Sequence, residues 1–206
     1  MADSHLVTTL AGLESLYGEV GEASRLKETD RIVPVYRALI EASPFAVLAT
    51  AGPDGLDCSP RGDGPGFVRV VDETMLLLPD RRGNNRIDSL RNILHDPRVA
   101  LLFLIPGVGE TLRVNGRAAI SADPALCESF AVDGRAPRTV IGITVDAVFF
   151  QCARAVARAD LWNPDKRLPR HALPSAGEIL AALSDGRAGG ESYDKALPER
   201  VKATLY

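Results

Sequence analysis

The sequence LLLPDRRGNNRIDSL, residues 76–90, is the stretch around which the rest of the chain can be interpreted. It begins as an apolar strand, continues through a basic turn that contains a glycine, and enters a predicted helix over residues 85–94. The unpaired N–H groups of a first helical turn and the helix dipole favour a bound anion, and Arg86 can add a fork of donors. The stretch therefore predicts an anion site. A surface helix whose arginines contact only water is the alternative.

Strand patterns surround this stretch on both sides. Seven segments that are apolar or alternate in polarity are predicted strands: 45–50, 56–60, 67–71, 74–78, 99–105, 111–120 and 140–151. The first two and the next two form hairpins around turns at 51–55 and 72–73. Short turns and few helices favour an antiparallel, closed or nearly closed barrel. A doubly wound parallel sheet would need regular crossover helices, and no GxGxxG follows a strand.

The remaining segments suggest a division into three parts: an N-terminal arm, partly helical, at 1–28; a barrel domain at 29–174; and a C-terminal helix and tail at 175–206. Within the barrel domain, Thr29 or Asp30 is the expected cap of a helix over 31–42. The sequence SAGE at 175–178 matches a capping box and predicts a helix to about Ser184. Residues 185–190 are expected to form a loop, and the last residues are expected to be loosely held.

Composition narrows the class of protein. The net charge is −3, with 24 Lys and Arg against 27 Asp and Glu, which argues against a general nucleic-acid binder. Cys58, Cys127 and Cys152 are far apart in the sequence, so we expect neither a disulfide framework nor a CxxC metal pattern, and a cytoplasmic location fits best. The longest apolar run, 99–105, is too short to span a bilayer, so no membrane association is expected.

Several catalytic chemistries lack their residues. The histidines, His5, His95 and His171, are isolated, and no GxSxG elbow is present, which excludes a typical serine hydrolase. The carboxylates show no paired spacing that would predict a metal cage, and no Walker A loop is present. The anion site therefore remains as the main functional signal, and no catalytic side chain is predicted.

At this point four motifs resemble those of a known family: SPRGD at 59–63, PDRRGNNR at 79–86, LRVNGRA at 112–118 and LWNP at 161–164. In their order and spacing, residues 45–162 resemble the pyridoxamine 5'-phosphate oxidase-related flavoproteins, which have an FMN-binding split barrel. The resemblance implies a homodimer that holds FMN at the subunit interface and acts as an FMN-dependent oxidoreductase on a small molecule.

The resemblance also implies a set of cofactor-binding residues: Arg61, Gly62, Asp63, Pro79, Asp80, Asn84, Asn85, Arg86, Ser89, Thr111, Arg113 and Trp162. Arg61 is implied to lie beside the flavin, Pro79 and Asp80 along the isoalloxazine edge, and Asn85 and Arg86 at the FMN phosphate. FMN suits this set, because a helix start with a guanidinium neutralises its phosphate and a barrel wall covers its apolar ring.

The sequence departs from the family pattern at two places, and these departures limit which properties of the family we expect in this protein. The pair at Asn85 and Arg86 is Arg-Lys in the oxidase proper, and Arg81 or Arg82 could replace the missing charge. The C-terminal signature that holds pyridoxal phosphate has no counterpart after Trp162, so pyridoxamine phosphate is not expected as the substrate. A carrier or sensor without turnover, or a deazaflavin- or haem-using barrel, are the alternatives.

Overall fold

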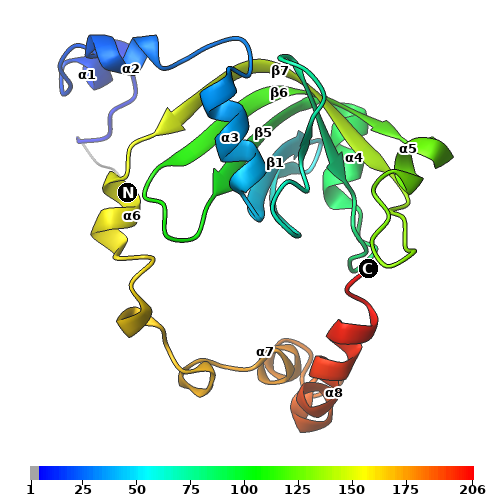
Figure 1. The fold of residues 1–206 in the computed structure, drawn as a ribbon. Helices are drawn as coiled ribbons and strands as arrows, with labels where there is room; N and C mark the ends of the chain where they lie inside the picture. Colours follow the sequence, from blue (N-terminus) through cyan, green and yellow to red (C-terminus); the bar gives the residue numbers. More distant parts are fainter. Residues whose placement is uncertain (1–4) are drawn as a thin grey trace.

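A computed structural model describes residues 5–206 and contains one seven-stranded sheet (Figure 1). Its strands are β1 (Phe45–Gly52), β2 (Gly55–Gly62), β3 (Arg69–Val70), β4 (Met75–Pro79), β5 (Arg98–Leu104), β6 (Thr111–Ser121) and β7 (Val140–Gln151). Their order across the sheet is β2-β1-β5-β6-β7-β4-β3, with every neighbouring pair antiparallel. The predicted hairpins and the mainly β, antiparallel split barrel are confirmed.

The core lies on the concave side of the curved sheet. Alternate residues of β5, such as Leu101 and Phe103, are buried, and their neighbours on the opposite face are half-exposed. The same alternation brings Leu48 of β1 and Val114 of β6 into this core. One face of the β1–β5–β6 region is therefore packed against the core, while the other face is turned outward.

Within residues 5–206, the sheet is accompanied by ten helical elements: α1 (Leu10–Glu14), α2 (Glu22–Leu26), α3 (Pro34–Ala42), α4 (Asp88–His95), α5 (Pro124–Glu128), α6 (Arg154–Ala159), η1 (Pro164–Lys166), η2 (Arg170–Ala172), α7 (Ala176–Leu183) and α8 (Gly190–Ala203). Of these, α3 packs against β3, β6 and β7 through its buried Tyr36 and Ile40. Helix α4 packs against β1, β2 and β6. α1 and α2 lie within the N-terminal segment, before α3.

Two predicted helix starts are wrong by three residues. Helix α3 begins at Pro34 rather than at residue 31, because Pro34 takes the first helical position, and Thr29 instead pairs with Val148 of β7. Helix α4 begins at Asp88 rather than at residue 85. Asn85 and Ile87 have φ angles of 60° and 54°, in the left-handed region that a right-handed helix excludes.

The C-terminal part departs most from prediction. Helix α7 has the predicted capping box, with Ser175 and Glu178 each bonding the other's backbone N–H. Beyond the loop after α7, the chain forms α8, the longest helix within residues 5–206, which continues through Pro198 and packs against α7. In Figure 1 this part leaves the end of β7, passes below the barrel and returns to it at the C-terminus.

Two further observations bear on the sequence predictions. Cys58, Cys127 and Cys152 are free thiols. Within residues 5–206, no helix combines the length and apolar character needed to cross a membrane. The proposed division at residues 28/29 and 174/175 stays a prediction.

Candidate functional site

A polar cluster lies between β2 and the start of α4. Because side chains of a strand alternate between its faces, Asp57, Ser59 and Arg61 of β2 project to one side, toward α4. The Arg61 guanidinium donates to the Ser89 hydroxyl over 3.1 Å, and Ser89 donates to an Asp57 carboxylate oxygen over 2.6 Å. Ser59 donates to the same oxygen over 2.9 Å. The Ser89 hydrogen bond, aided by Ser59 and Arg61, lowers the pKa of Asp57.

Arg61 is not fully satisfied by these contacts. Its two terminal nitrogens donate to Ser89 and to the backbone oxygen of Pro60, but its Nε is buried and has no hydrogen-bond partner among the described residues. Buried polar atoms are nearly always paired, so an orphaned guanidinium N–H is a place where a ligand acceptor would be stabilised.

Asp80 lies near Arg61, directly after β4. Its backbone N–H donates to Thr139 over 3.0 Å, which fixes the chain at the point where it leaves the sheet. Burial of the Asp80 carboxyl raises its pKa, and the attraction of Arg61 only partly opposes this effect. Arg61 and Asp80 are thus a basic and an acidic side chain that lie near each other and are half-buried, and Pro79, next to Asp80, is buried.

A second ion pair joins the same two strand ends. Arg81 Nε donates to Asp63 over 2.7 Å, with only 16% and 8% of the two side chains exposed, and Arg81 Nη1 donates to the backbone oxygen of Phe130 over 2.7 Å. Arg81 is therefore engaged in structure and is not free to replace the missing phosphate charge. Gly62, the last residue of β2, precedes Asp63 and is exposed.

Residues 82–87 form an exposed loop before α4. The Asn84 side chain accepts the backbone N–H of Arg86 over 3.0 Å, an Asx-type turn that competes with helix formation. Arg86 donates to Asp88 over 2.7 Å, with 73% of its side chain exposed. Arg82 is exposed and has no hydrogen bond or ion pair within residues 5–206. The loop therefore offers two guanidinium groups to solvent, although Asn84, Asn85 and Arg86 precede the first helical turn.

Thr111, Arg113 and Trp162 lie elsewhere. Thr111 begins β6, and the Arg113 guanidinium lies 5.3 Å from the centre of the Phe149 ring. Trp162 Nε1 donates to the backbone oxygen of Val108, in the turn before β6, over 2.7 Å. These three residues are therefore grouped around the start of β6, which lies three strands from β2.

The strand register places Arg61 and Arg113 on opposite faces of the sheet. Arg61 pairs with Ala46, Ala46 with Phe103, and Phe103 with Leu112, so these residues share the inner face. Arg113 follows Leu112 and projects to the outer face. No hydrogen bond or ion pair within the described part of the chain connects Thr111, Arg113 or Trp162 to Arg61 or Asp80.

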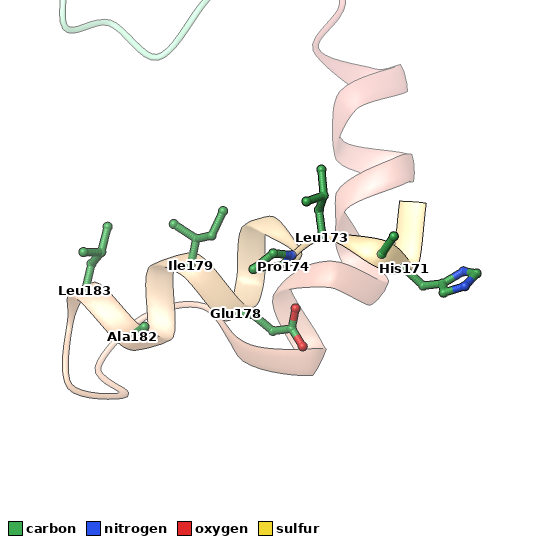
Figure 2. Close-up of a pocket in the computed structure, with 8 residues that line it drawn as sticks. His171, Leu173, Pro174, Glu178, Ile179, Ala182 and Leu183 are labelled. Carbon is green, nitrogen blue, oxygen red and sulfur yellow. The ribbon is translucent and has the colours of Figure 1, made fainter. Parts of the chain in front are cut away.

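Two hollows in the structure lie away from both groups. One, of about 630 Å³, is open and lies between η2 and α7, where Leu173, Ile179 and Leu183 extend to one side (Figure 2). The other, of about 460 Å³, lies on the outer face of β1, β5 and β6, near Leu56 and Asn115. None of the predicted site residues lines either hollow. The described residues contain no group of three or more His, Cys, Asp or Glu that could hold a metal ion.

Two residues of this region, Asp57 and Tyr206, were not predicted from the sequence. Asp57 has the same-face spacing with Ser59 and Arg61 on a predicted strand, so alternation alone could have identified it. Tyr206, whose hydroxyl donates to Asp63 over 2.8 Å, is separated from it by 143 positions, and no local pattern signals such a contact.

The fold and these polar groups define an antiparallel split barrel with a basic loop beside the ends of β2 and β4. The chain belongs to the pyridoxamine 5'-phosphate oxidase family, because the family model matches residues 32–152, more than half of the chain. A search of curated proteins gave no match.

Several solved structures are similar. HupZ from Group A Streptococcus is 23% identical, with a TM-score of 0.48, over 59% of this chain and 94% of that one. A putative pyridoxamine 5'-phosphate oxidase from Lactobacillus delbrueckii is 21% identical, with a TM-score of 0.45, over 59% and 95%. General Stress Protein 26 from Bacillus anthracis is 18% identical, with a TM-score of 0.42, over 55% and 88%. Family membership rests on the match over residues 32–152.

Proposed function

We propose that this protein binds FMN and acts as an oxidoreductase on a small molecule. The observation that carries the proposal is the buried Nε of Arg61, unpaired among the described residues, beside the half-buried Asp80 and near a loop that carries the exposed Arg82 and Arg86. A flavin ring has acceptor and donor atoms along one edge, and its phosphate carries two negative charges. The polar groups of Arg61 and Asp80 and the cations on the loop match both ends of such a ligand.

The loop can receive a phosphate without rebuilding the core. Arg82 has no competing partner among the described residues, and Arg86 is held only by the exposed carboxylate of Asp88. Exposed ion pairs are worth little, so a dianionic phosphate can compete with Asp88 for Arg86. Ser89 is already used in linking Arg61 to Asp57, and its part in the proposal is to orient Arg61.

The bound flavin would supply the transfer of hydride or electrons, and the protein would supply position and electrostatics. The side chain of Arg61 would donate its Nε–H to an acceptor of the ring. The carboxyl of Asp80, whose burial favours the protonated form, would donate or accept at the ring edge according to its protonation. These roles need no nucleophile, which agrees with the lack of a predicted catalytic side chain.

The proposal includes a homodimer with FMN between the subunits. Arg61 and Arg113 project to opposite faces of the sheet, so both can contact one ligand only if a second copy supplies the outer-face group. The outer face of β1 and β5 is apolar and half-exposed at Val47 and Leu102, and Leu56 beside it is 90% exposed. Such a surface is typical of a subunit interface. A cytoplasmic location stays a prediction.

The test is a visible absorption spectrum of the purified protein, followed by titration with FMN, deazaflavin and haem. A flavin spectrum, or tight binding of added FMN, is expected. A protein that binds none of them contradicts the proposal, and preference for deazaflavin or haem assigns a different cofactor. Reduction of bound FMN by candidate donors faster than that of free FMN supports an oxidoreductase, whereas equal rates favour a carrier or sensor.

A further inference from the structure

The contact of Tyr206 with the Arg81–Asp63 ion pair is unexplained by the function proposed so far. Tyr206 lies outside residues 32–152, the part of the chain that defines the family. Its hydroxyl donates to Asp63 Oδ1 over 2.8 Å, and its ring centre lies 5.4 Å from the Arg81 guanidinium. Arg135 donates to its backbone oxygen over 3.3 Å. Side chain and backbone of one residue are therefore both held at the barrel.

The ion pair that Tyr206 contacts connects two strands that are not neighbours in the sheet. β2 is one edge of the sheet and β4 lies next to the other edge, so no backbone ladder joins them. Asp63 follows β2 and Arg81 follows β4, and their buried contact is the link between the two strand ends. Asp63 receives three donors, from Gly64, Tyr206 and Arg81, and these outweigh the effect of burial and lower its pKa.

Both residues at the centre of the proposed flavin site are close neighbours of this link along the chain. Arg61 lies two residues before Asp63, and Asp80 lies directly before Arg81. A shift of either member of the ion pair would therefore move Arg61 relative to Asp80. Ligand groups must be held to within a fraction of an ångström for tight binding, so the link sets the geometry of the site.

The C-terminal segment reaches this place across a long span. Among the described residues, no hydrogen bond or ion pair joins residues 163–205 to the barrel, and the segment is bonded again only at Tyr206. Figure 1 shows the same path, with α7 and α8 below the barrel and the C-terminus next to it. Where the segment returns to the barrel, the Tyr206 phenol contacts the buried ion pair of Asp63 and Arg81.

We propose that Tyr206 is a positioning residue of the flavin site, which acts through Asp63 and Arg81 to fix Arg61 relative to Asp80. This inference rests on the proposed function for the identity of the ligand, but the positioning itself is a property of the protein alone. The phenol completes the hydrogen bonding of Asp63, and its ring lies over the Arg81 guanidinium.

The test compares Tyr206→Phe, which keeps the ring and removes the donor, with Tyr193→Phe. Tyr193 lies on α8, where its ring stacks on Arg200, and no hydrogen bond of its hydroxyl occurs among the described residues. In flavin-free protein, Tyr206→Phe is expected to speed amide hydrogen exchange several-fold at residues 61–64 and 79–82. It is expected to weaken FMN binding about three- to tenfold, and Tyr193→Phe is expected to change neither quantity.

Each outcome decides one of the two proposals. Unchanged exchange at both strand ends in Tyr206→Phe overturns the positioning role, and so does faster exchange with an FMN affinity equal to that of the parent protein. A parent protein that binds no FMN overturns the proposed function. In that case the exchange rates alone decide whether Tyr206 fixes the two strand ends.

Discussion

Arg61 is the residue whose surroundings say most about the site. It lies on a strand edge where Ser89 and the Pro60 backbone oxygen take its terminal nitrogens, while Nε stays buried and unpaired among the described residues. An unpaired buried donor destabilises the free protein, and an acceptor on a ligand would remove that penalty. Arg61 thus has a buried N–H donor for which the described residues provide no acceptor.

The first prediction at this scale concerns the loop cation. Arg86→Ala is expected to weaken FMN binding about ten- to a hundredfold, the effect of losing a charged hydrogen bond to phosphate, with the fold intact. Fluorescence titration of FMN measures the affinity. Arg91→Ala, an exposed arginine on the next turn of α4, is the control and should bind FMN normally. Equal affinity in the two variants would place the phosphate elsewhere.

The second prediction concerns Asp80 and pH. Because burial raises its pKa in the folded protein, the ionised carboxylate destabilises the fold above its ordinary pKa, and this penalty vanishes in acid. Asp80→Asn is therefore expected to raise the Tm at pH 7 by about 2–4 °C, and to give no gain at about pH 3. Thermal unfolding of both proteins at both pH values tests this. A lower Tm at pH 7 would show that the attraction between Asp80 and Arg61 outweighs burial.

Helix α4 is the element that decides the form of the proposed anion site. Its first turn contains Asp88 and the buried Ser89, so the helix start bears a carboxylate and is tied to β2. The basic residues lie on the loop before it, where Asn85 and Ile87 are left-handed. A β-branched residue such as Ile87 is strained in this conformation, and such strain is concentrated at functional sites. We therefore expect the guanidinium groups of Arg82 and Arg86, on the loop before α4, to be the phosphate donors instead of the N–H groups of the first helical turn.

A third prediction tests how α4 is seated on the barrel. A Cβ atom at Gly52 of β1 would lie 2.0 Å from the Oδ1 atom of Asn92, which is on α4. The side-chain amide nitrogen of Asn92 donates to the Thr50 hydroxyl. Gly52→Ala is expected to displace Asn92 and to destabilise the protein by about 1–3 kcal/mol. Urea unfolding measures the loss, and Gly83→Ala, with no atom within 4 Å of the added Cβ, is the control. Equal stability of both variants would show that α4 can shift freely.

At the scale of the whole molecule, the sheet divides the proposed site between its two faces. Arg61 lies on the inner face near α4, and Thr111 and Arg113 lie on the outer face. In the proposed homodimer, a second copy related by two-fold symmetry would bring the outer-face residues of one subunit to the inner-face residues of the other. The half-exposed apolar residues of β1 and β5 are the surface that we propose for that contact.

The fourth prediction concerns this assembly. Leu102→Glu places a charge on the outer face of β5 and is expected to convert a dimer to a monomer and to abolish tight FMN binding. Sedimentation velocity and FMN titration measure the two effects. Val71→Glu, next to β3 at the opposite edge of the sheet, is the control and should stay dimeric. A parent protein that sediments as a monomer, or a dimeric Leu102→Glu variant with normal affinity, would contradict the dimer.

The barrel could be predicted because each of its strands carries its own signal. Segments such as 140–151 are apolar or alternating along their whole length, and β7 has these bounds in the structure. Helix ends were less well predicted, because one Asx turn at Asn84 and two left-handed residues override the local helix pattern of 85–87. Helix α8 was missed, because Pro198 indicates a break whereas packing against α7 maintains the helix.

The sequence by itself therefore determined the strands, their hairpins and the family resemblance, since these depend on polarity patterns and motifs over a few adjacent residues. Only the tertiary structure decided which guanidinium groups are engaged. Arg81 is bound to Asp63 and Arg86 is bound to Asp88, while Arg82 faces solvent. It also decided that Tyr206 lies beside Asp63. The Arg86–Asp88 contact is local, between residues two positions apart. The contacts of Asp63 with Arg81 and with Tyr206 join residues that are distant in the chain, and they form because the fold brings the ends of β2 and β4 together.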